Sequence, residues 1–243
     1  MKKFYFLLSL PRAGNTLFGS LVNNNNRDVV VTGNDSFLNL LYSIYKIKEE
    51  RTLKYFPDIN SYNNVYKNIF NNYFKDFKQK HIILRGPYGT PLNLKIIKEF
   101  FPRIKFIVLK RPTLECLASL IKIYKPENIE HFVDSVMDQN GLIGKDLWSM
   151  NNVRYSKENH LEISYEELCN ETSKFFKKLN IFLDTDIQYN TKEIKDFTVN
   201  GIKYNDDYAV KNLHKLKTKI IKSELNINKY LPKHIIERYN DYN

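Results

Sequence analysis

The stretch "FLLSLPRAGNTLFGSLV", residues 6–22, passes from an apolar run through a short turn into what reads as the first turns of a helix. A strand, a turn of small residues and a helix start leave backbone N–H groups without partners, and the helix N-terminus adds the positive end of its dipole. A turn of this kind is suited to bind an anion.

The side chains of this turn also suit a phosphate or a sulfate. Arg12 offers a planar fork of donors, and Gly14 lets the backbone come close to a ligand. Asn15 and Thr16 add an amide and a hydroxyl at the helix start. The motif G-x-x-x-x-G-K-[ST] of ATP- and GTP-binding loops is absent, because no Lys-Ser or Lys-Thr follows Gly14. The same residue types also make an ordinary strand-to-helix turn, so this stretch alone leaves both interpretations open.

Composition limits the class of protein. The chain has 243 residues and no linker rich in Pro, Gly or Ser, which predicts one domain spanning 1–243. Its 38 Lys and Arg against 27 Asp and Glu give a formal net charge of +11, which suits a polyanionic ligand, a nucleic acid or a membrane surface equally well. Lysines are spread almost evenly from Lys2 to Lys233, as on a solvated surface.

Cysteine usage and hydropathy bear on location. Cys116 and Cys169 lie far apart, without the spacing of metal ligands, so we expect no metal site, no disulfide and a cytoplasmic location. The apolar start of the chain is too short for a signal peptide and is interrupted by Pro11 and Arg12, so we interpret it as a buried strand. No apolar run approaches the ~20 residues of a membrane span, and none is expected.

Strand-like and helix-like segments alternate along the chain. Strands are expected at 4–10, 27–33, 81–85, 105–110 and 160–164. Helices are expected at 15–23, 36–50, 61–78, 92–102, 113–124, 127–151 and 166–182. This alternation predicts an α/β fold with a central parallel sheet flanked by helices, and a ligand at the carboxyl ends of the strands.

A second candidate anion subsite follows the strand "KFIVLK", residues 105–110. Arg111 stands at the carboxyl end of this strand, and Ser119 follows about two turns into the next helix. Together they suit a second phosphate beside the first, because Arg111 can donate from both arms of its fork and Ser119 from its hydroxyl. Taken singly, a surface arginine and a serine bonded to its own helix backbone explain them better.

Taken in order, three blocks of the chain resemble the sulfotransferase family, whose sulfate donor is 3′-phosphoadenosine 5′-phosphosulfate (PAPS). "LPRAGNTL" at 10–17 resembles the family's 5′-phosphosulfate loop. "FFPRIKFIVLKRPTLECLASL" at 100–120 resembles its 3′-phosphate segment, and "LEISYEELCNETSKFFKKLNIFL" at 161–183 resembles its Tyr-Glu-Asp-Leu segment and the following helix. The resemblance implies a P-loop-like sulfotransferase fold and transfer of a sulfuryl group from PAPS to a hydroxyl or amine, leaving adenosine 3′,5′-bisphosphate (PAP).

The resemblance also implies roles for the matching residues. Those that would wrap the 5′-phosphosulfate are Arg12, Ala13, Gly14, Asn15 and Thr16. Arg111 and Ser119 would hold the 3′-phosphate, and Tyr165 would lie near the adenine. The chain departs from the family pattern with Ala13 for Ser and Asn15 for Thr. Loss of the Ser hydroxyl removes a donor at the bridging oxygen, which bears on the rate more than on donor binding.

By the same resemblance the domain has three parts. They are a donor-binding core at about 1–33 and 81–183, an acceptor-side helical insert at about 34–80, and a C-terminal segment at about 200–243 that would cover the donor. Within the last part, "AVKNLHKLKTK" at 209–219 offers His214 and Lys217 to the donor, although a plain basic helix explains this segment almost as well.

In-line sulfuryl transfer needs no metal but does need charge stabilisation and a base. Arg12 would stabilise the leaving phosphate. Many family members carry a base His after the third strand, and "LRGPYGT" at 84–90 lacks it. Another branch uses a Glu after the second strand, where this chain has Asp35 in "TGNDS". We therefore predict Asp35 as the base, although an Asp in this setting is equally typical of a turn or helix cap. The remaining candidates are Tyr88, His81, His131, His160 and His214.

Two other classes of function are compatible with parts of the sequence. A P-loop kinase shares the strand, turn and helix, but it needs a Lys and a magnesium-binding hydroxyl that the loop at 11–17 lacks. A basic nucleic-acid binder fits the net charge, but the even spread of lysines does not indicate a binding stripe, so no nucleic acid is expected. The expected partner is an acceptor: a small molecule, a sugar or a peptide. The sequence leaves the oligomeric state open.

Overall fold

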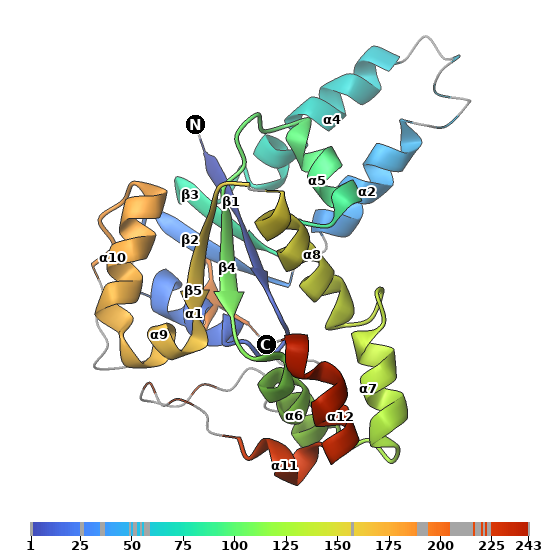
Figure 1. Ribbon diagram of the computed structural model, residues 1–243. Coiled ribbons are helices and arrows are strands. Elements are labelled where there is room, and N and C mark those ends of the chain that lie inside the picture. The colour runs from blue at the N-terminus through green and yellow to red at the C-terminus, as the bar shows by residue number, and fades with distance from the viewer. Residues whose placement is uncertain are drawn as a thin grey trace.

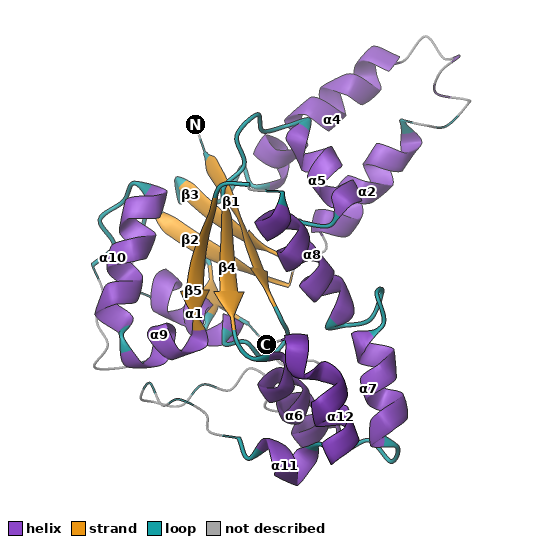
Figure 2. Cartoon of the chain, viewed as in Figure 1, coloured by secondary structure: helices purple, strands orange, loops and turns teal. Residues whose placement is uncertain are grey.

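The structure is a computed structural model. It describes residues 2–24, 27–34, 37–48, 50, 53, 55, 59–156, 158–188, 194–204, 216, 220, 222 and 225–242. A central sheet carries helices on both faces, and further helices gather beyond the carboxyl ends of its strands (Figures 1 and 2). The predicted α/β class is therefore confirmed.

Five parallel strands form the sheet, in the order β2-β3-β1-β4-β5. Their bounds are β1 (Lys3–Ser9), β2 (Val29–Asn34), β3 (His81–Arg85), β4 (Phe106–Lys110) and β5 (His160–Ser164). The connection that leaves β1 runs toward the β2 edge, whereas the connection that leaves β4 runs toward the β5 edge. In open parallel sheets such a reversal opens a crevice at the carboxyl ends of the two strands, where ligands bind.

The helices divide into groups around this sheet. Their bounds are α1 (Asn15–Asn23), α2 (Phe37–Ile47), α4 (Ile59–Tyr73), α5 (Pro91–Lys98), α6 (Thr113–Tyr124), α7 (Ile129–Met137), α8 (Gly144–Tyr155), α9 (Tyr165–Asn170), α10 (Thr172–Leu183), α11 (Ile227–Tyr230) and α12 (Lys233–Tyr239), with a 3-10 turn at Asn240–Tyr242. A short hairpin, β6 (Thr198–Val199) and β7 (Ile202–Lys203), lies beside α1 and β2. In Figure 1, α6, α11 and α12 gather below the tip of β4, and α2, α4 and α5 form a separate group at the upper right.

The sheet is the centre of the hydrophobic core. Its inner strands are apolar on both faces, as expected for parallel strands covered by helices, and residues Phe106 to Leu109 of β4 are fully buried. Phe70 of α4 and Phe74, directly after α4, pack edge-on or tilted against Phe4 of β1 and Phe37 of α2, with ring centroids 4.8–5.6 Å apart. These rings attach the α2–α4 group to the sheet.

Two of the predicted helices are each divided in two. The segment 127–151 forms α7 and α8, separated by a turn in which the chain comes so close to itself that a Cβ on Gly144 would lie 2.0 Å from the carbonyl oxygen of Asp138. The segment 166–182 forms α9 and α10, because Glu171 leaves the helical region at φ −126°. Both predictions of a single helix were wrong. Each break falls in a polar stretch, 138–141 and 170–174, and the first contains Asn140-Gly141, a local turn signal.

We expect the core to respond to a cavity at β4. Ile107→Ala empties a site that is 0% exposed and lowers the free energy of unfolding by about 2–5 kcal/mol. The matched control is Ile181→Ala on α10, where the side chain is 75% exposed and the change stays within about 0.5 kcal/mol. Urea unfolding of the two variants measures both. Equal losses would contradict the placement of β4 in the core.

Candidate functional site

The turn between β1 and α1 has an unusual backbone. Arg12 has φ 69° and Gly14 has φ 102°, so the chain is left-handed at two places within three residues. Gly14 is the N-cap of α1 and no side chain caps the helix there. A non-glycine residue at positive φ costs free energy, and such residues gather at binding sites. The turn thus presents the start of α1 without the usual capping side chain.

Polar atoms in and before this turn are buried. Asn15 donates from Nδ2 to the carbonyl oxygen of Leu10 at 3.0 Å, which holds the turn closed. The Oγ of Ser9 at the end of β1 is buried and has no hydrogen-bond partner among the described residues. Buried polar atoms without partners are rare in proteins. A hydroxyl donor beside an open helix start fits an anionic ligand.

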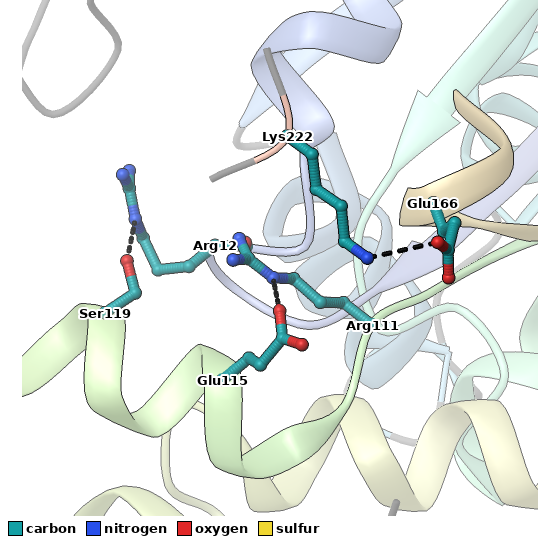
Figure 3. A network of polar contacts seen from close by, with 6 residues as sticks. All are labelled: Arg12, Arg111, Glu115, Ser119, Glu166 and Lys222. Carbon is teal, nitrogen blue, oxygen red and sulfur yellow. Dashed lines mark hydrogen bonds and ion pairs between the residues drawn. The ribbon is translucent and has the colours of Figure 1, made fainter. Parts of the chain in front are cut away.

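Arg111, directly after β4, contacts the turn from the neighbouring strand end. Its guanidinium donates from Nη1 to the carbonyl oxygen of Arg12 at 2.8 Å. It also donates from Nε to Glu115 Oε2 at 2.8 Å (Figure 3). Arg12 in turn donates from Nε to Ser119 Oγ on α6 at 3.2 Å. The two sequence-predicted anion subsites are therefore joined by direct hydrogen bonds.

Tyr165 completes this cluster from the end of β5. The guanidinium carbon of Arg111 lies 4.2 Å above the centroid of the Tyr165 ring, within the range of a cation–π contact. A Cβ added to Gly14 would lie 2.7 Å from Cδ2 of the same ring, so the turn accepts only glycine at this point. The structure thus brings together Arg12, Gly14, Arg111, Ser119 and Tyr165, which the sequence singled out from three separate blocks.

The cluster carries excess positive charge. Burial, and next the positive charge of Arg111, lower the pKa of the Arg12 guanidinium. Glu115 pairs with Arg111 and supplies negative charge to the cluster. Two like charges held together away from water favour an anion between or beside them. The arrangement can therefore bind a phosphate or sulfate.

A third arginine and an aspartate lie on the β3 side of Arg12. Arg85 ends β3, and burial lowers the pKa of its guanidinium. Asp146 stands in the first turn of α8, and burial raises the pKa of its carboxyl to about 7, even though Arg85 and Lys145 act in the opposite direction. Sequence reasoning missed Asp146, because an acidic residue in the first turn of a helix is commonplace.

Other residues named from the sequence lie elsewhere. His81 and His160 stand at the amino ends of β3 and β5, and His131 stands on α7, so none of the three lies at the carboxyl end of a strand. Tyr88 is buried in the core, and its ring centroid lies 4.7 Å from that of Phe6. Among the described residues we therefore find none of these four placed as a base. Asp35, His214 and Lys217 lie outside the described residues.

Three further features concern metal ligands, cysteines and membrane-spanning helices. Within the described ranges, no group of three or more His, Cys, Asp or Glu side chains has the geometry of a metal site. Cys116 and Cys169 are buried free thiols, and burial raises the pKa of Cys116 to about 12. No helix in the part of the chain that the structure describes is both long and apolar enough to cross a bilayer.

No protein-family model and no curated protein matches the sequence, but solved structures share its fold. The sulfotransferase domain from the curacin biosynthetic pathway matches with a TM-score of 0.54 and 14% identity, over 77% of this chain and 76% of that domain. Mouse sulfotransferase SULT7A1 complexed with PAP matches with a TM-score of 0.56 and 18% identity, over 99% of this chain and 82% of the mouse chain. A sulfotransferase from Alicyclobacillus acidocaldarius matches with a TM-score of 0.57 and 9% identity, over 100% of this chain and 92% of that chain. The predicted sulfotransferase fold is confirmed.

The raised pKa of Asp146 predicts how stability depends on pH. Because the folded-state pKa of about 7 lies above the ordinary 3.8, the contribution of this carboxyl to stability is complete below about pH 4 and is lost as the pH rises to about 7. Asp146→Asn removes that loss. The melting temperature of the variant minus that of the wild type should therefore increase between about pH 4 and pH 8.

Thermal unfolding across this pH range measures the effect. The control is Asp184→Asn, which removes a carboxylate whose side chain is 89% exposed and for which no such increase is expected. A difference for Asp146→Asn that stays constant or decreases with pH would show that the carboxyl is not desolvated.

Proposed function

We propose that the chain is a sulfotransferase that moves a sulfuryl group from PAPS to a hydroxyl or amine acceptor. The observation that carries this proposal is the convergence of Arg12, Arg111, Ser119 and Tyr165 at the carboxyl ends of β1, β4 and β5. The convergence occurs in a fold shared with solved sulfotransferases, of which the mouse enzyme is complexed with PAP.

The donor would lie across the two subsites. We assign the 5′-phosphosulfate to the turn of Arg12–Thr16, where the uncapped start of α1 and the Arg12 side chain offer donors. We assign the 3′-phosphate to Arg111 and Ser119. Since Ser119 Oγ is 3.2 Å from Arg12 Nε, the two anion subsites are neighbours, as a nucleotide with phosphates on both sides of one ribose requires.

We assign the adenine side and the cover of the donor to other segments of the chain. We assign the adenine to the side of Tyr165, and the donor cover to the segment at 209–219 with His214 and Lys217. Lys222, a little further along the chain, bonds Glu166 Oε1 at 3.1 Å, next to Tyr165 (Figure 3). This contact supports a path of the C-terminal segment alongside the donor site.

Catalysis by these residues would be mainly electrostatic. PAPS supplies an activated sulfuryl group whose transfer leaves negative charge on the departing phosphate. Arg12 is half-buried and bonded on one side to Ser119, so its charge is fixed in a region of reduced water access, where it stabilises that developing charge more than it would in solvent. The acceptor side would be formed in part by the insert at 34–80, including α2 and α4.

A kinase is not favoured as an alternative. The loop at 10–17 carries no lysine, and kinases with this topology use one against the β- and γ-phosphates. The charged residues instead extend from the loop to Arg111, directly after the neighbouring strand β4. This arrangement supports a ligand with two separate anionic groups.

The proposal predicts selective binding of the product nucleotide. PAP should raise the melting temperature of the chain, whereas ATP with Mg²⁺ should do so much less, because ATP lacks the 3′-phosphate that Arg111 and Ser119 are assigned to hold. Differential scanning fluorimetry with both ligands measures this. Equal stabilisation by the two would contradict the donor assignment.

Arg111 should be the main determinant of this affinity. Arg111→Ala should weaken PAP binding by about 2–4 kcal/mol, because a buried phosphate then loses its charged partner. The control Arg103→Ala removes an exposed arginine before β4 and should leave the affinity unchanged. Isothermal titration calorimetry gives both values. A loss below about 0.5 kcal/mol for Arg111→Ala would indicate an arginine without a ligand role.

A further inference from the structure

The loop after β3 rests directly on α8. The N–H of Gly89 donates to Ser149 Oγ at 2.8 Å, and Asn152 Nδ2 donates to the carbonyl oxygen of Gly89 at 2.7 Å. A Cβ on Gly89 would lie 2.4 Å from the carbonyl oxygen of Ser149, so only a glycine allows this approach. These contacts fix one face of α8 against the carboxyl end of β3.

Asp146 belongs to the same face of α8. Residues 146, 149 and 152 follow one another in steps of three, and side chains at that spacing lie on one side of a helix. The Asp146 carboxylate is therefore directed to the end of β3, where Arg85 stands, and the charges of the two residues act on each other. Among the described residues, none forms a hydrogen bond or ion pair with this carboxylate.

The strand order places Asp146 on the acceptor side of the proposed donor site. β3, β1 and β4 are neighbours in that order, so Arg85, Arg12 and Arg111 follow one another along the carboxyl edge of the sheet. A donor held by Arg111 on the β4 side reaches Arg12 with its 5′ end. The opposite side of Arg12, toward Arg85 and Asp146, is then the side from which an acceptor can attack in line.

We propose that Asp146 is the general base of the reaction, and this inference rests on the proposed function. The acceptor oxygen or nitrogen forms a bond to sulfur while the bond from sulfur to the bridging phosphate oxygen breaks. That electron pair stays on the leaving phosphate beside Arg12, and the acceptor's proton passes to the Asp146 carboxylate, which later releases it to water. Arg85 is a positioning residue that keeps the carboxylate charged and directed at the cleft.

The chemistry of the carboxyl supports this role. Burial is the main influence on the pKa of Asp146, yet the residue keeps partial exposure to solvent, so an acceptor can reach it. Its pKa of about 7 makes it a stronger base than an ordinary aspartate and still leaves much of it deprotonated at neutral pH. The charges that act on it are those of Arg85 from β3 and Lys145 of its own helix, and Tyr204 and Arg12 act on Arg85.

The test measures sulfuryl transfer from radiolabelled PAPS by the full-length chain to sugars, tyrosyl peptides, simple alcohols and water. Asp146→Asn should lower turnover ~100-fold or more, remove the loss of rate that the wild type shows below about pH 7, and leave PAP affinity unchanged. Asp146→Glu, which keeps a carboxylate, should retain the acid limb of the pH profile. Asp184→Asn, at an exposed site, should behave as the wild type.

The outcomes separate the two proposals. Normal turnover and an unchanged pH profile in an Asp146→Asn variant that binds PAP would overturn the role of Asp146 and leave the proposed function intact. If Asp35→Asn removes the acid limb and Asp146→Asn does not, the base is the residue predicted from the sequence. A wild-type chain that neither binds PAP nor transfers sulfate to any acceptor, water included, would overturn both proposals.

Discussion

The contact on which the site depends is the hydrogen bond from the Arg111 guanidinium to the backbone carbonyl of Arg12. It holds the Arg111 guanidinium against the backbone of Arg12, close enough for the positive charge of Arg111 to act on the Arg12 side chain. Glu115 and the face of the Tyr165 ring compensate for the charge of Arg111. The same ring excludes any side chain at Gly14, so the turn, the strand ends and α9 fit together only with these residues in place. A site that stores positive charge in this way is suited to an anion.

The order of the strands decides which residues lie on each side of Arg12. Because β1 lies between β3 and β4, Arg12 has Arg111 on one side and Arg85 on the other. Under the proposed function the nucleotide occupies the β4 and β5 side, and the acceptor enters from the β3 side, between the sheet and α8. The backbone of Gly89, in the loop after β3, is hydrogen-bonded to the side chains of Ser149 and Asn152, so this loop and α8 are held at a fixed distance. Under that proposal the fold separates the residues assigned to the donor from those assigned to the acceptor.

Local patterns predicted the elements better than the breaks between them. The strand at 81–85 and the helix at 113–124 were predicted to the residue, since composition and flanking Pro and Gly define them within a few positions. The break within 127–151 was missed although Asn140-Gly141 is a local turn signal, and its close backbone packing is visible only in the structure. The residues of the two proposed anion subsites were named from the sequence, and the structure brings Arg12, Arg111 and Ser119 into contact. That they bind an anion stays a prediction. Asp146 was not named from the sequence, because its interaction with Arg85 arises only when folding brings the two residues near each other.

The central claim is that residues at the carboxyl ends of β1 and β4 bind two phosphate groups of one nucleotide. A crystal structure of the chain with PAP tests this claim most directly. The account predicts the 5′-phosphate in the turn of Arg12–Thr16, the 3′-phosphate against Arg111 and Ser119, and the adenine beside Tyr165. A nucleotide bound elsewhere, or bound with its 3′-phosphate facing solvent, would contradict it.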